Sequence, residues 1–245
     1  MIGSVVSPEL RARVRGMALP VALAFGRLGL TPNALTVLGF GISIVAAVAA
    51  AQQAWIAAGL LVIFGGVFDL FDGALARATN RVSRLGAFLD SVFDRAGEAV
   101  LYLGIAIGCL EGGGIAPMFT IGAVLAAAAM GASFMVSYTR AKSESLGFTP
   151  GTGMANVGVA PREVRLVLLT IGLILTGSFG GVQQHSPLLD LLEAPWFGGR
   201  PILAAALALI TILATITTIQ RIIHVTRQNP PDADSAATPG GDQHP

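Results

Sequence analysis

Four aspartates stand in two pairs between residues 68 and 95. Asp69 and Asp72 are three residues apart and Asp90 and Asp94 are four apart, so in helices each pair would share one face. Glycine and alanine residues accompany both pairs, which leaves room for a cleft in front of the carboxylates. Because clustered carboxylates cannot all stay ionised without cations, this spacing predicts a site that gathers positive charge.

Two sources of that positive charge remain open from the residues alone. The arginines of the same stretch can neutralise the aspartates as ordinary ion pairs. Alternatively, hard divalent ions such as Mg²⁺ can do so, since they prefer oxygen ligands to His or Cys. Four aspartates exceed what the solvation of a charged loop needs, which favours the metal site.

The composition indicates that this site belongs to a membrane protein. The 245 residues are 53% hydrophobic and 12% charged, too few charges to cover a soluble domain of this size. A lone cysteine, Cys109, excludes an intrachain disulfide. We predict an all-α membrane protein with six transmembrane helices of about 20 residues. They are expected at Ala34 to Ala51, Ala54 to Phe71, Ala87 to Leu110, Ala116 to Tyr138, Val164 to Val182 and Pro201 to Ile219.

The two ends of the chain are predicted to lie outside these spans. Residues 1–30 spread arginines through an apolar pattern, which is typical of an amphipathic interfacial helix. Residues 31–227 would form the six-span domain. Residues 228–245 are rich in Pro, Gly and Asp and are predicted to be a disordered tail.

The basic residues favour one orientation in the membrane, because cytoplasmic loops carry an excess of Lys and Arg. With both termini in the cytoplasm, Arg200 alone of the 15 Lys and Arg residues lies outside. We therefore expect an integral protein of the cell membrane whose aspartates face one another at the cytoplasmic edge of the bilayer.

A second basic set follows the aspartates and consists of Arg140, Lys142, Arg162, Arg165 and Arg221. As topology signals, these residues need no ligand. Alternatively, they form a phosphate pocket, because Arg162 and Arg165, three residues apart at a helix start, project together and can grip a phosphate. Both interpretations remain open.

The residues from Asp69 to Asp94 resemble the signature of a known family. They match the pattern D-x2-D-G-x2-A-R-x8-G-x3-D-x3-D of the class I CDP-alcohol phosphotransferases position for position. The six-span layout and the segment LTPNALT, residues 30–36, are also similar to that family. The resemblance implies an enzyme that moves a phosphatidyl-type group from a CDP-linked lipid to an alcohol and releases CMP. It also implies a homodimer.

The same resemblance implies roles for individual residues. Asp69, Asp72, Asp90 and Asp94 would hold two Mg²⁺ ions, with Mn²⁺ as a possible substitute. Asp94 would also accept the proton of the attacking hydroxyl. The CDP-linked lipid would contact the turn formed by Asn33, Ala34, Leu35 and Thr36, together with Gly73, Arg77 and Ser83.

The acceptor alcohol is expected to carry a phosphate. The run SYTRAK, residues 137–142, and the downstream arginines resemble the family members that use inositol 1-phosphate, the phosphatidylinositol phosphate synthases. Arg140 stands where a lysine is often found, and PREVR replaces a Glu-Arg-Pro-Glu-Arg run, so glycerol 3-phosphate stays an alternative acceptor.

Other residues and functions carry less weight. Glu98 shares the face of Asp94 and could support a metal site, but an acid there more often pairs locally, here with Arg95. A divalent-cation transporter is a remote alternative. It should carry polar residues near the middle of several spans, whereas the first, fourth and sixth predicted spans are almost purely apolar. Nucleic-acid binding has no support, since the basic residues follow the topology and lack interleaved aromatics.

Overall fold

The computed structural model describes residues 8–111, 121–148, 157–179 and 201–228. The described residues form seven α-helices and no β-strand, which confirms the all-α prediction. The helices are α1 (Pro8–Arg27), α2 (Pro32–Ala51), α3 (Trp55–Ala78), α4 (Arg84–Glu111), α5 (Ile121–Ser145), α6 (Arg162–Phe179) and α8 (Pro201–Thr226).

Four of these helices, α2, α3, α5 and α8, are long and apolar enough to cross a membrane. The chain is therefore a membrane protein. Helices α4 and α6 fall outside this group because each carries several charged side chains, among them Asp94 and Glu98 in α4 and Arg162 and Arg165 in α6. That α4 and α6 also span the membrane, which would make six spans, thus stays a prediction. Helix α1 lies within residues 1–30, the segment predicted to be interfacial.

Several helices run past the ends of the predicted spans. The second span was expected to end at Phe71, but α3 continues to Ala78 and so carries Asp72 and Arg77 within the helix. Likewise α5 ends at Ser145 and α8 at Thr226, beyond the apolar runs that predicted them. Residues 116–120 and 180–182 of the predicted spans lie outside the described residues. A helix needs no apolar residues once it leaves the bilayer, so hydropathy underestimates its length.

Local signals set the helix starts near the aspartates. Thr31 caps α2, with its side-chain Oγ1 accepting a hydrogen bond from the backbone N–H of Ala34 at 3.2 Å, and Pro32 follows as the first helical residue. Residues 33–36, expected as a turn, therefore form the first turn of α2. At α4, Ser83 Oγ accepts from the N–H of Gly86 at 3.0 Å.

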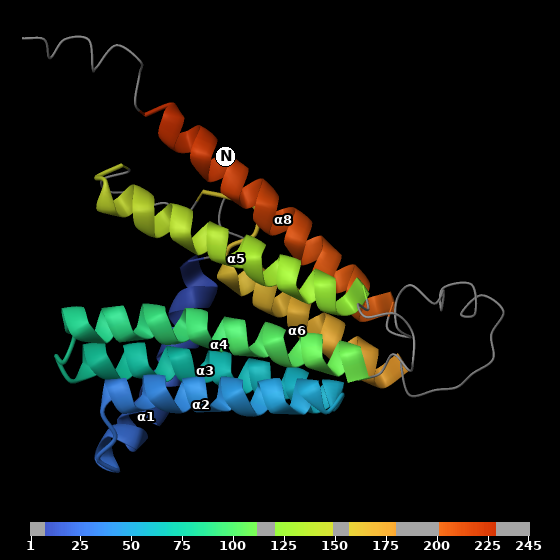
Figure 1. Cartoon of the computed structure of the whole chain (residues 1–245). Coiled ribbons are helices and arrows are strands. Elements are labelled where there is room, and N and C mark those ends of the chain that lie inside the picture. The colour runs from blue at the N-terminus through green and yellow to red at the C-terminus, as the bar shows by residue number, and fades with distance from the viewer. Residues whose placement is uncertain (1–7, 112–120, 149–156, 180–200, 229–245) are drawn as a thin grey trace, which may run out of the picture.

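Six helices pack around one another so that each contacts two neighbours (Figure 1). Helix α2 contacts both α3 and α4, and α8 contacts both α5 and α6. Contacts of α3 with α6 and of α4 with α5 complete the arrangement, and all six helices share one hydrophobic core. Helix α1 packs on α3 through a smaller cluster that includes Ala18, Ala22 and Leu75.

Glycines allow α2 and α4 to approach until their backbones touch. A Cβ added to Gly104 would run into the backbone carbonyl of Ala47, and one added to Gly108 would run into that of Ala50. Small residues at such a crossing are typical of helices packed in membranes, where close van der Waals contact holds the pair together.

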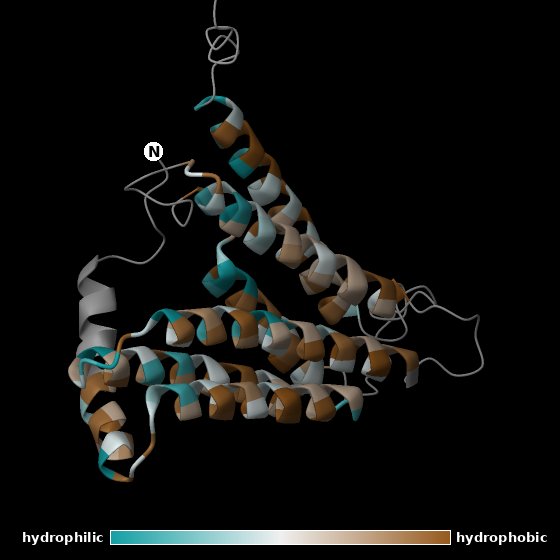
Figure 2. Ribbon diagram, turned by 60° about the vertical axis from the view of Figure 1, so that its left-hand side comes forward, coloured by the Kyte–Doolittle hydropathy of each residue, from teal (hydrophilic) through white to brown (hydrophobic). Residues whose placement is uncertain are grey.

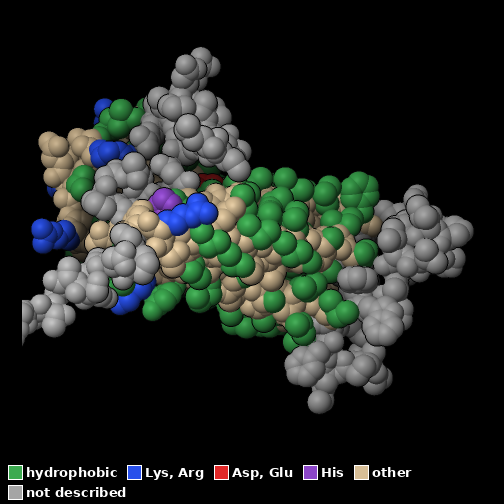
Figure 3. Space-filling view, turned by 90° about the horizontal axis from the view of Figure 1, so that it is seen from above, with side chains coloured by type: hydrophobic (Ala, Val, Ile, Leu, Met, Phe, Trp, Pro, Cys, Tyr) green, Lys and Arg blue, Asp and Glu red, His purple; other side chains and the backbone are tan. Residues whose placement is uncertain are grey.

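Charged and polar side chains gather at one end of the bundle, here called the polar end. This end contains the α3–α4 connection at residues 79–83, the last turns of α5 and α8, and the start of α6 (Figure 1). Figure 2 shows hydrophilic residues toward this end and apolar residues along most of each helix. In Figure 3 the Lys and Arg side chains likewise lie at one end of a largely hydrophobic face.

Candidate active site

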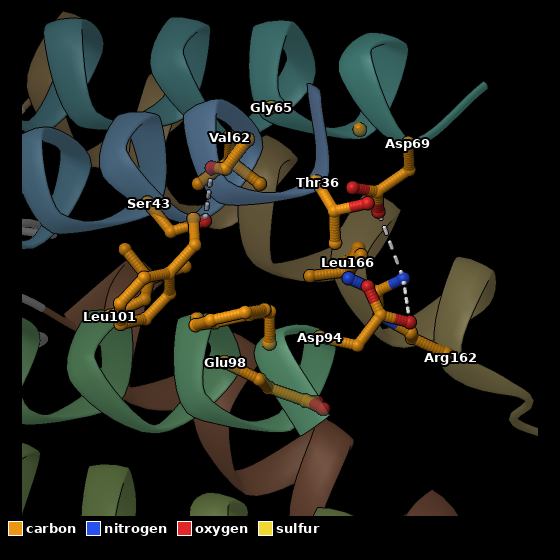
Figure 4. Close-up of a pocket in the computed structure, with 15 residues that line it drawn as sticks. Thr36, Ser43, Val62, Gly65, Asp69, Asp94, Glu98, Leu101, Arg162 and Leu166 are labelled. Carbon is orange, nitrogen blue, oxygen red and sulfur yellow. Dashed lines mark hydrogen bonds and ion pairs between the residues drawn. The ribbon is translucent and has the colours of Figure 1, made fainter. Parts of the chain in front are cut away.

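Asp69 of α3 and Asp94 of α4 face each other at the polar end across one guanidinium, that of Arg162. Arg162 Nη1 donates to Asp94 Oδ2 at 2.7 Å and to Asp69 Oδ2 at 3.0 Å (Figure 4). The side chain of Asp94 is only 15% exposed, and that of Asp69 is 27% exposed. Because Arg162 begins α6, three helices converge here, and the predicted approach of the two carboxylate pairs is confirmed for Asp69 and Asp94.

The other two aspartates lie beside this bridge. Thr36 Oγ1, in the first turn of α2, donates to Asp72 Oδ2 at 2.7 Å, and both side chains are buried. Asp90 is close enough to Asp69 and Asp94 for their charges to interact. The structure thus brings all four predicted aspartates to one region, with Thr36 as a direct partner of one of them.

The donor chemistry of this region fits a hard divalent metal ion, since Asp69, Asp72, Asp90 and Asp94 offer carboxylate oxygens only. Within the described part of the chain, no three Asp, Glu, His or Cys side chains lie close enough to one another to bind a single metal ion. The carboxylates of Asp69 and Asp94 nevertheless already share a cation, the Arg162 guanidinium. A metal ion bound by both would require Arg162 to move aside.

A small cavity of about 40 Å³ opens in front of the carboxylates. It lies between α2, α3, α4 and α6 and is drawn in Figure 4. Asp69, Asp94 and Arg162 line its polar part, and Gly39 and Gly65 contribute no side chain to its wall. This volume suits one or two water molecules. A cleft is therefore present in front of Asp69 and Asp94 but is narrow, and of the small residues that accompany the aspartate pairs, Gly97 lines it whereas Gly73, Ala76 and Gly86 do not.

A second and larger cavity of about 950 Å³ adjoins the first, and Asp94 and Arg162 line both. Its walls come from α4, α5 and α8 and from the start of α6. Five arginines line it, namely Arg95, Arg140, Arg162, Arg165 and Arg221, together with the acidic residues Asp90, Asp94, Glu144 and Glu163. Four of the five residues predicted to bind an acceptor phosphate thus meet here, whereas Lys142 is not among the lining residues.

The arginines of this cavity differ in how firmly the protein holds them. Arg165 is 1% exposed and donates through Nη1 to the carbonyl of Ala160 at 3.1 Å and through Nη2 to Glu98 at 3.2 Å. Arg221 donates to the carbonyls of Val157 and Val136. These partners hold Arg165 and Arg221 in place, while Arg140 pairs, among the described residues, with the exposed Glu144.

The residues predicted to contact the CDP-linked lipid lie along the start of α2 and the ends of α3 and α4. Asn33 and Ser83 come together over Gly86, where an added Cβ would lie 3.3 and 3.1 Å from their side-chain oxygens. The Arg77 guanidinium lies over Gly73, 3.2 Å from where a Cβ would stand. The side chain of Leu35 is fully buried against α1 and α3, so only its backbone could contact a ligand. The side chain of its neighbour Ala34 is partly buried.

The structure shows two contacts near the site that the sequence did not predict, one made by Glu98 and one by Ser137. The predicted local pair of Glu98 and Arg95 is confirmed at 3.2 Å, but Glu98 also binds Arg165 from α6. Ser137 of α5, the first residue of the SYTRAK run, accepts from Arg95 Nη1 at 2.6 Å. The run was linked to the acceptor, but nothing in it indicated a contact between Ser137 and Arg95.

Comparisons with known proteins agree with this arrangement. The family model for CDP-alcohol phosphatidyltransferase matches residues 29–227. The chain is 34% identical to an archaetidylinositol phosphate synthase of Pyrococcus horikoshii over 71% of this chain and 85% of that one. It is 32% identical to a phosphatidylinositol phosphate synthase of Cutibacterium acnes, covering 85% of this chain and 91% of that one.

Solved structures show the same fold. A phosphatidylinositol phosphate synthase of Mycobacterium tuberculosis, in complex with manganese and citrate, matches with a TM-score of 0.69 and 26% identity over 92% of this chain and 96% of that one. The same enzyme with CDP-DAG bound matches with a TM-score of 0.67 and 25% identity, covering 89% and 96% of the two chains. With its aspartate signature intact, the chain therefore belongs to the CDP-alcohol phosphatidyltransferase family, a family of transferases.

Proposed function

We propose that the protein transfers the phosphatidyl-type group of a CDP-linked lipid to inositol 1-phosphate and releases CMP. The observation that carries this proposal is that Asp94 and Arg162 line both the carboxylate cleft and a cavity lined by arginines. A carboxylate site suits a metal-bound pyrophosphate, and arginine is well shaped to bind phosphate with two parallel hydrogen bonds. Because the two cavities adjoin, a donor bound at the carboxylates and an acceptor bound among the arginines would lie next to each other.

The cofactor of this reaction is proposed to be two Mg²⁺ ions, with Mn²⁺ as a substitute, held by Asp69, Asp72, Asp90 and Asp94. The donor set fits such ions, and the solved relative of Mycobacterium tuberculosis is in complex with manganese. When bound, the ions would neutralise charge on the pyrophosphate and on the departing CMP. Thr36 supports this role by fixing the Asp72 carboxylate with a 2.7 Å hydrogen bond.

The chain's own residues handle the proton and the acceptor. The acceptor hydroxyl attacks the lipid-side phosphorus, the bond from that phosphorus to the CMP oxygen breaks, and Asp94 takes up the hydroxyl proton. Asp94 suits this role because it borders the arginine-lined cavity from which the acceptor would arrive. Arg162 would leave Asp69 and Asp94 and pair with the acceptor phosphate, with Arg140, Lys142, Arg165 and Arg221 contributing to the positive surroundings.

Binding of the donor is proposed along the start of α2 and the α3–α4 connection. Asn33 and Ser83 meet at Gly86, and Arg77 lies over Gly73, which directly follows Asp72, so these polar groups lie near the aspartates. The backbone of Ala34 and Leu35 and the hydroxyl of Thr36 follow Asn33 in the first turn of α2. The nucleotide would then sit at the polar end while the lipid tails stay among the helices.

The placement in the membrane is part of this proposal. We propose six spans, including α4 and α6, in the cell membrane, with both termini and the active site on the cytoplasmic side. Residues 1–30 would lie at the interface, residues 31–227 would form the catalytic domain and residues 228–245 a tail. A homodimer, implied by the family resemblance, is also proposed, and crosslinking in native membranes would detect it.

A comparison of acceptors tests the proposed function. The purified protein in liposomes receives CDP-diacylglycerol, Mg²⁺ and one of inositol 1-phosphate, glycerol 3-phosphate, inositol or serine, and CMP release is measured. Inositol 1-phosphate is expected to react fastest by orders of magnitude. Preference for glycerol 3-phosphate would change the acceptor, and preference for an unphosphorylated alcohol would overturn the phosphate pocket. Failure to release CMP with any acceptor, alongside cation flux, would indicate a transporter.

A further inference from the structure

An ion cluster in the wall of the arginine-lined cavity consists of Arg95, Glu98 and Arg165. Glu98 stands one turn after Asp94 on α4 and is 3% exposed. Its Oε1 accepts from Arg165 Nη2 at 3.2 Å, and its Oε2 accepts from Arg95 Nη1 at 3.2 Å. One carboxylate therefore holds two guanidinium groups, from α4 and α6, in fixed positions.

The two arginines of this cluster differ in their access to the cavity. The side chain of Arg165 is 1% exposed, so a ligand could reach it only after a rearrangement. The side chain of Arg95 is 30% exposed and lines the cavity. The accessible cation of the cluster is therefore Arg95.

The contacts of Arg95 leave part of its guanidinium for a ligand. Nη1 is the atom held by the protein, since it donates to Glu98 at 3.2 Å and to Ser137 Oγ at 2.6 Å. Nη2 lies 3.6 Å from Asp94 Oδ2, which is an ion-pair distance longer than a hydrogen bond. A guanidinium carries five N–H donors in a rigid plane, so fixing one nitrogen orients the others.

Charge balance explains why the cluster has three members. A buried carboxylate is tolerated only when it is paired, and Arg165, almost inaccessible to solvent, supplies that partner for Glu98. Arg95 is then a second cation on the same carboxylate, and its Nη2 lies in the 3.6 Å ion pair with Asp94, so an anion in the cavity would compete with Asp94 for this nitrogen. Glu98 and Arg165 thus act as an internal support for Arg95.

We propose that Arg95 is a further acceptor-binding residue that contacts the phosphate of the phosphorylated polyol, and that Glu98 and Ser137 position it. This inference rests on the proposed function. It also changes the role expected for Arg165, which acts through Glu98 rather than on the acceptor. The closeness of Arg95 to Asp94 places the bound phosphate next to the residue that takes the proton.

The experiment measures KM for inositol 1-phosphate and for CDP-diacylglycerol with the full chain in liposomes. Arg95→Ala should raise the acceptor KM roughly 10- to 150-fold, as expected for a lost hydrogen-bonded charge, and Arg95→Lys should recover part of it. Ser137→Ala should raise it about two- to tenfold. The KM for the CDP-lipid should stay within about twofold. Ser145→Ala is the matched control, because within the described part of the chain that hydroxyl bonds back to the carbonyl of Lys142 in the same helix.

A binding measurement separates positioning from a purely structural role. Thermal stabilisation by inositol 1-phosphate, without the CDP-lipid, should shrink in Arg95→Ala and Glu98→Gln and be partly restored in Glu98→Asp. If Glu98→Gln does not fold, Ser137→Ala carries the same test.

The possible results are distinguishable. A fall in kcat at unchanged acceptor KM in Arg95→Ala would mean that Arg95 only orients Asp94, which overturns the inference. A wild-type acceptor KM in both Ser137→Ala and Glu98→Gln would overturn the positioning role. Failure of the wild-type protein itself to use inositol 1-phosphate would instead refute the proposed function.

Discussion

Replacing Arg162 with alanine should change metal affinity and acceptor affinity in opposite directions. In the structure, Arg162 Nη1 bonds to Asp94 at 2.7 Å and to Asp69 at 3.0 Å, so its guanidinium competes with any metal ion for these two carboxylates. Removing the competitor should strengthen metal binding. Removing the cation from the large cavity should weaken binding of a phosphorylated acceptor.

The size of the metal effect follows from those two contacts. Hydrogen bonds to charged groups contribute about 1.5–3 kcal/mol each, so the pair amounts to roughly 3–6 kcal/mol before solvation is counted. The released guanidinium regains water, and we take about half of that energy, roughly 1.5–3 kcal/mol, as net competition. This corresponds to a decrease of roughly 10- to 150-fold in the Kd of the metal.

Calorimetric titration of the substrate-free protein with Mg²⁺ or Mn²⁺ measures this Kd directly. Arg140→Ala is the matched control, since it removes an equal charge from the same cavity but from a residue paired with Glu144. The expected result is tighter binding in Arg162→Ala and little change in Arg140→Ala. An unchanged or weaker metal affinity in Arg162→Ala would refute the competition, whatever happens to the acceptor KM.

Three further substitutions test other parts of the site and fold. Asp94→Asn should lower kcat by roughly 10²–10⁴ while circular dichroism shows an intact helical fold, because an amide cannot take up the proton; a loss below about tenfold would exclude Asp94 as the base. Thr36→Val should weaken binding of Mg²⁺ and a soluble CDP analogue by roughly tenfold or more in calorimetry, because the Asp72 carboxylate loses its 2.7 Å hydrogen bond, whereas Thr36→Ser should not. Gly104→Ala should destabilise the protein by about 1–3 kcal/mol in thermal unfolding, since its Cβ meets the backbone of Ala47, whereas Gly41→Ala, with nothing within 4 Å of its Cβ, should be neutral.

The parts of the site that depend on short-range spacing could be predicted from the sequence. The helical period places Asp90 and Asp94 on one face, and the short connection between α3 and α4 brings Asp69 opposite them. Apolar runs likewise located the helices, although they missed the polar turns at the helix ends. These features follow from local geometry, which a single sequence contains.

Apart from the local pair of Arg95 and Glu98, the partners of the arginines could not be predicted in the same way. Arg162 lies 93 positions from Asp69 in the chain, and their contact depends on how α6 packs against α3. The same holds for Arg95 and Ser137, which meet only because α4 and α5 lie side by side. Hydropathy and motif spacing contain no information about such packing, so the basic residues could be assigned to a cavity but not to their individual partners.

The order of the helices along the chain has a consequence for how substrate choice can evolve. The aspartates and the proposed donor contacts belong to α2, α3 and α4, whereas four of the five arginines that line the acceptor cavity belong to α5, α6 and α8. Mutations of Arg140 or Arg221, which bond to groups other than the aspartates, can therefore alter the alcohol that is used without disturbing nucleotide chemistry, whereas mutations of Arg162 affect both. A hybrid enzyme joined between α4 and α5 should inherit most of its acceptor contacts from the parent that supplies the C-terminal half, and Arg95 from the other parent.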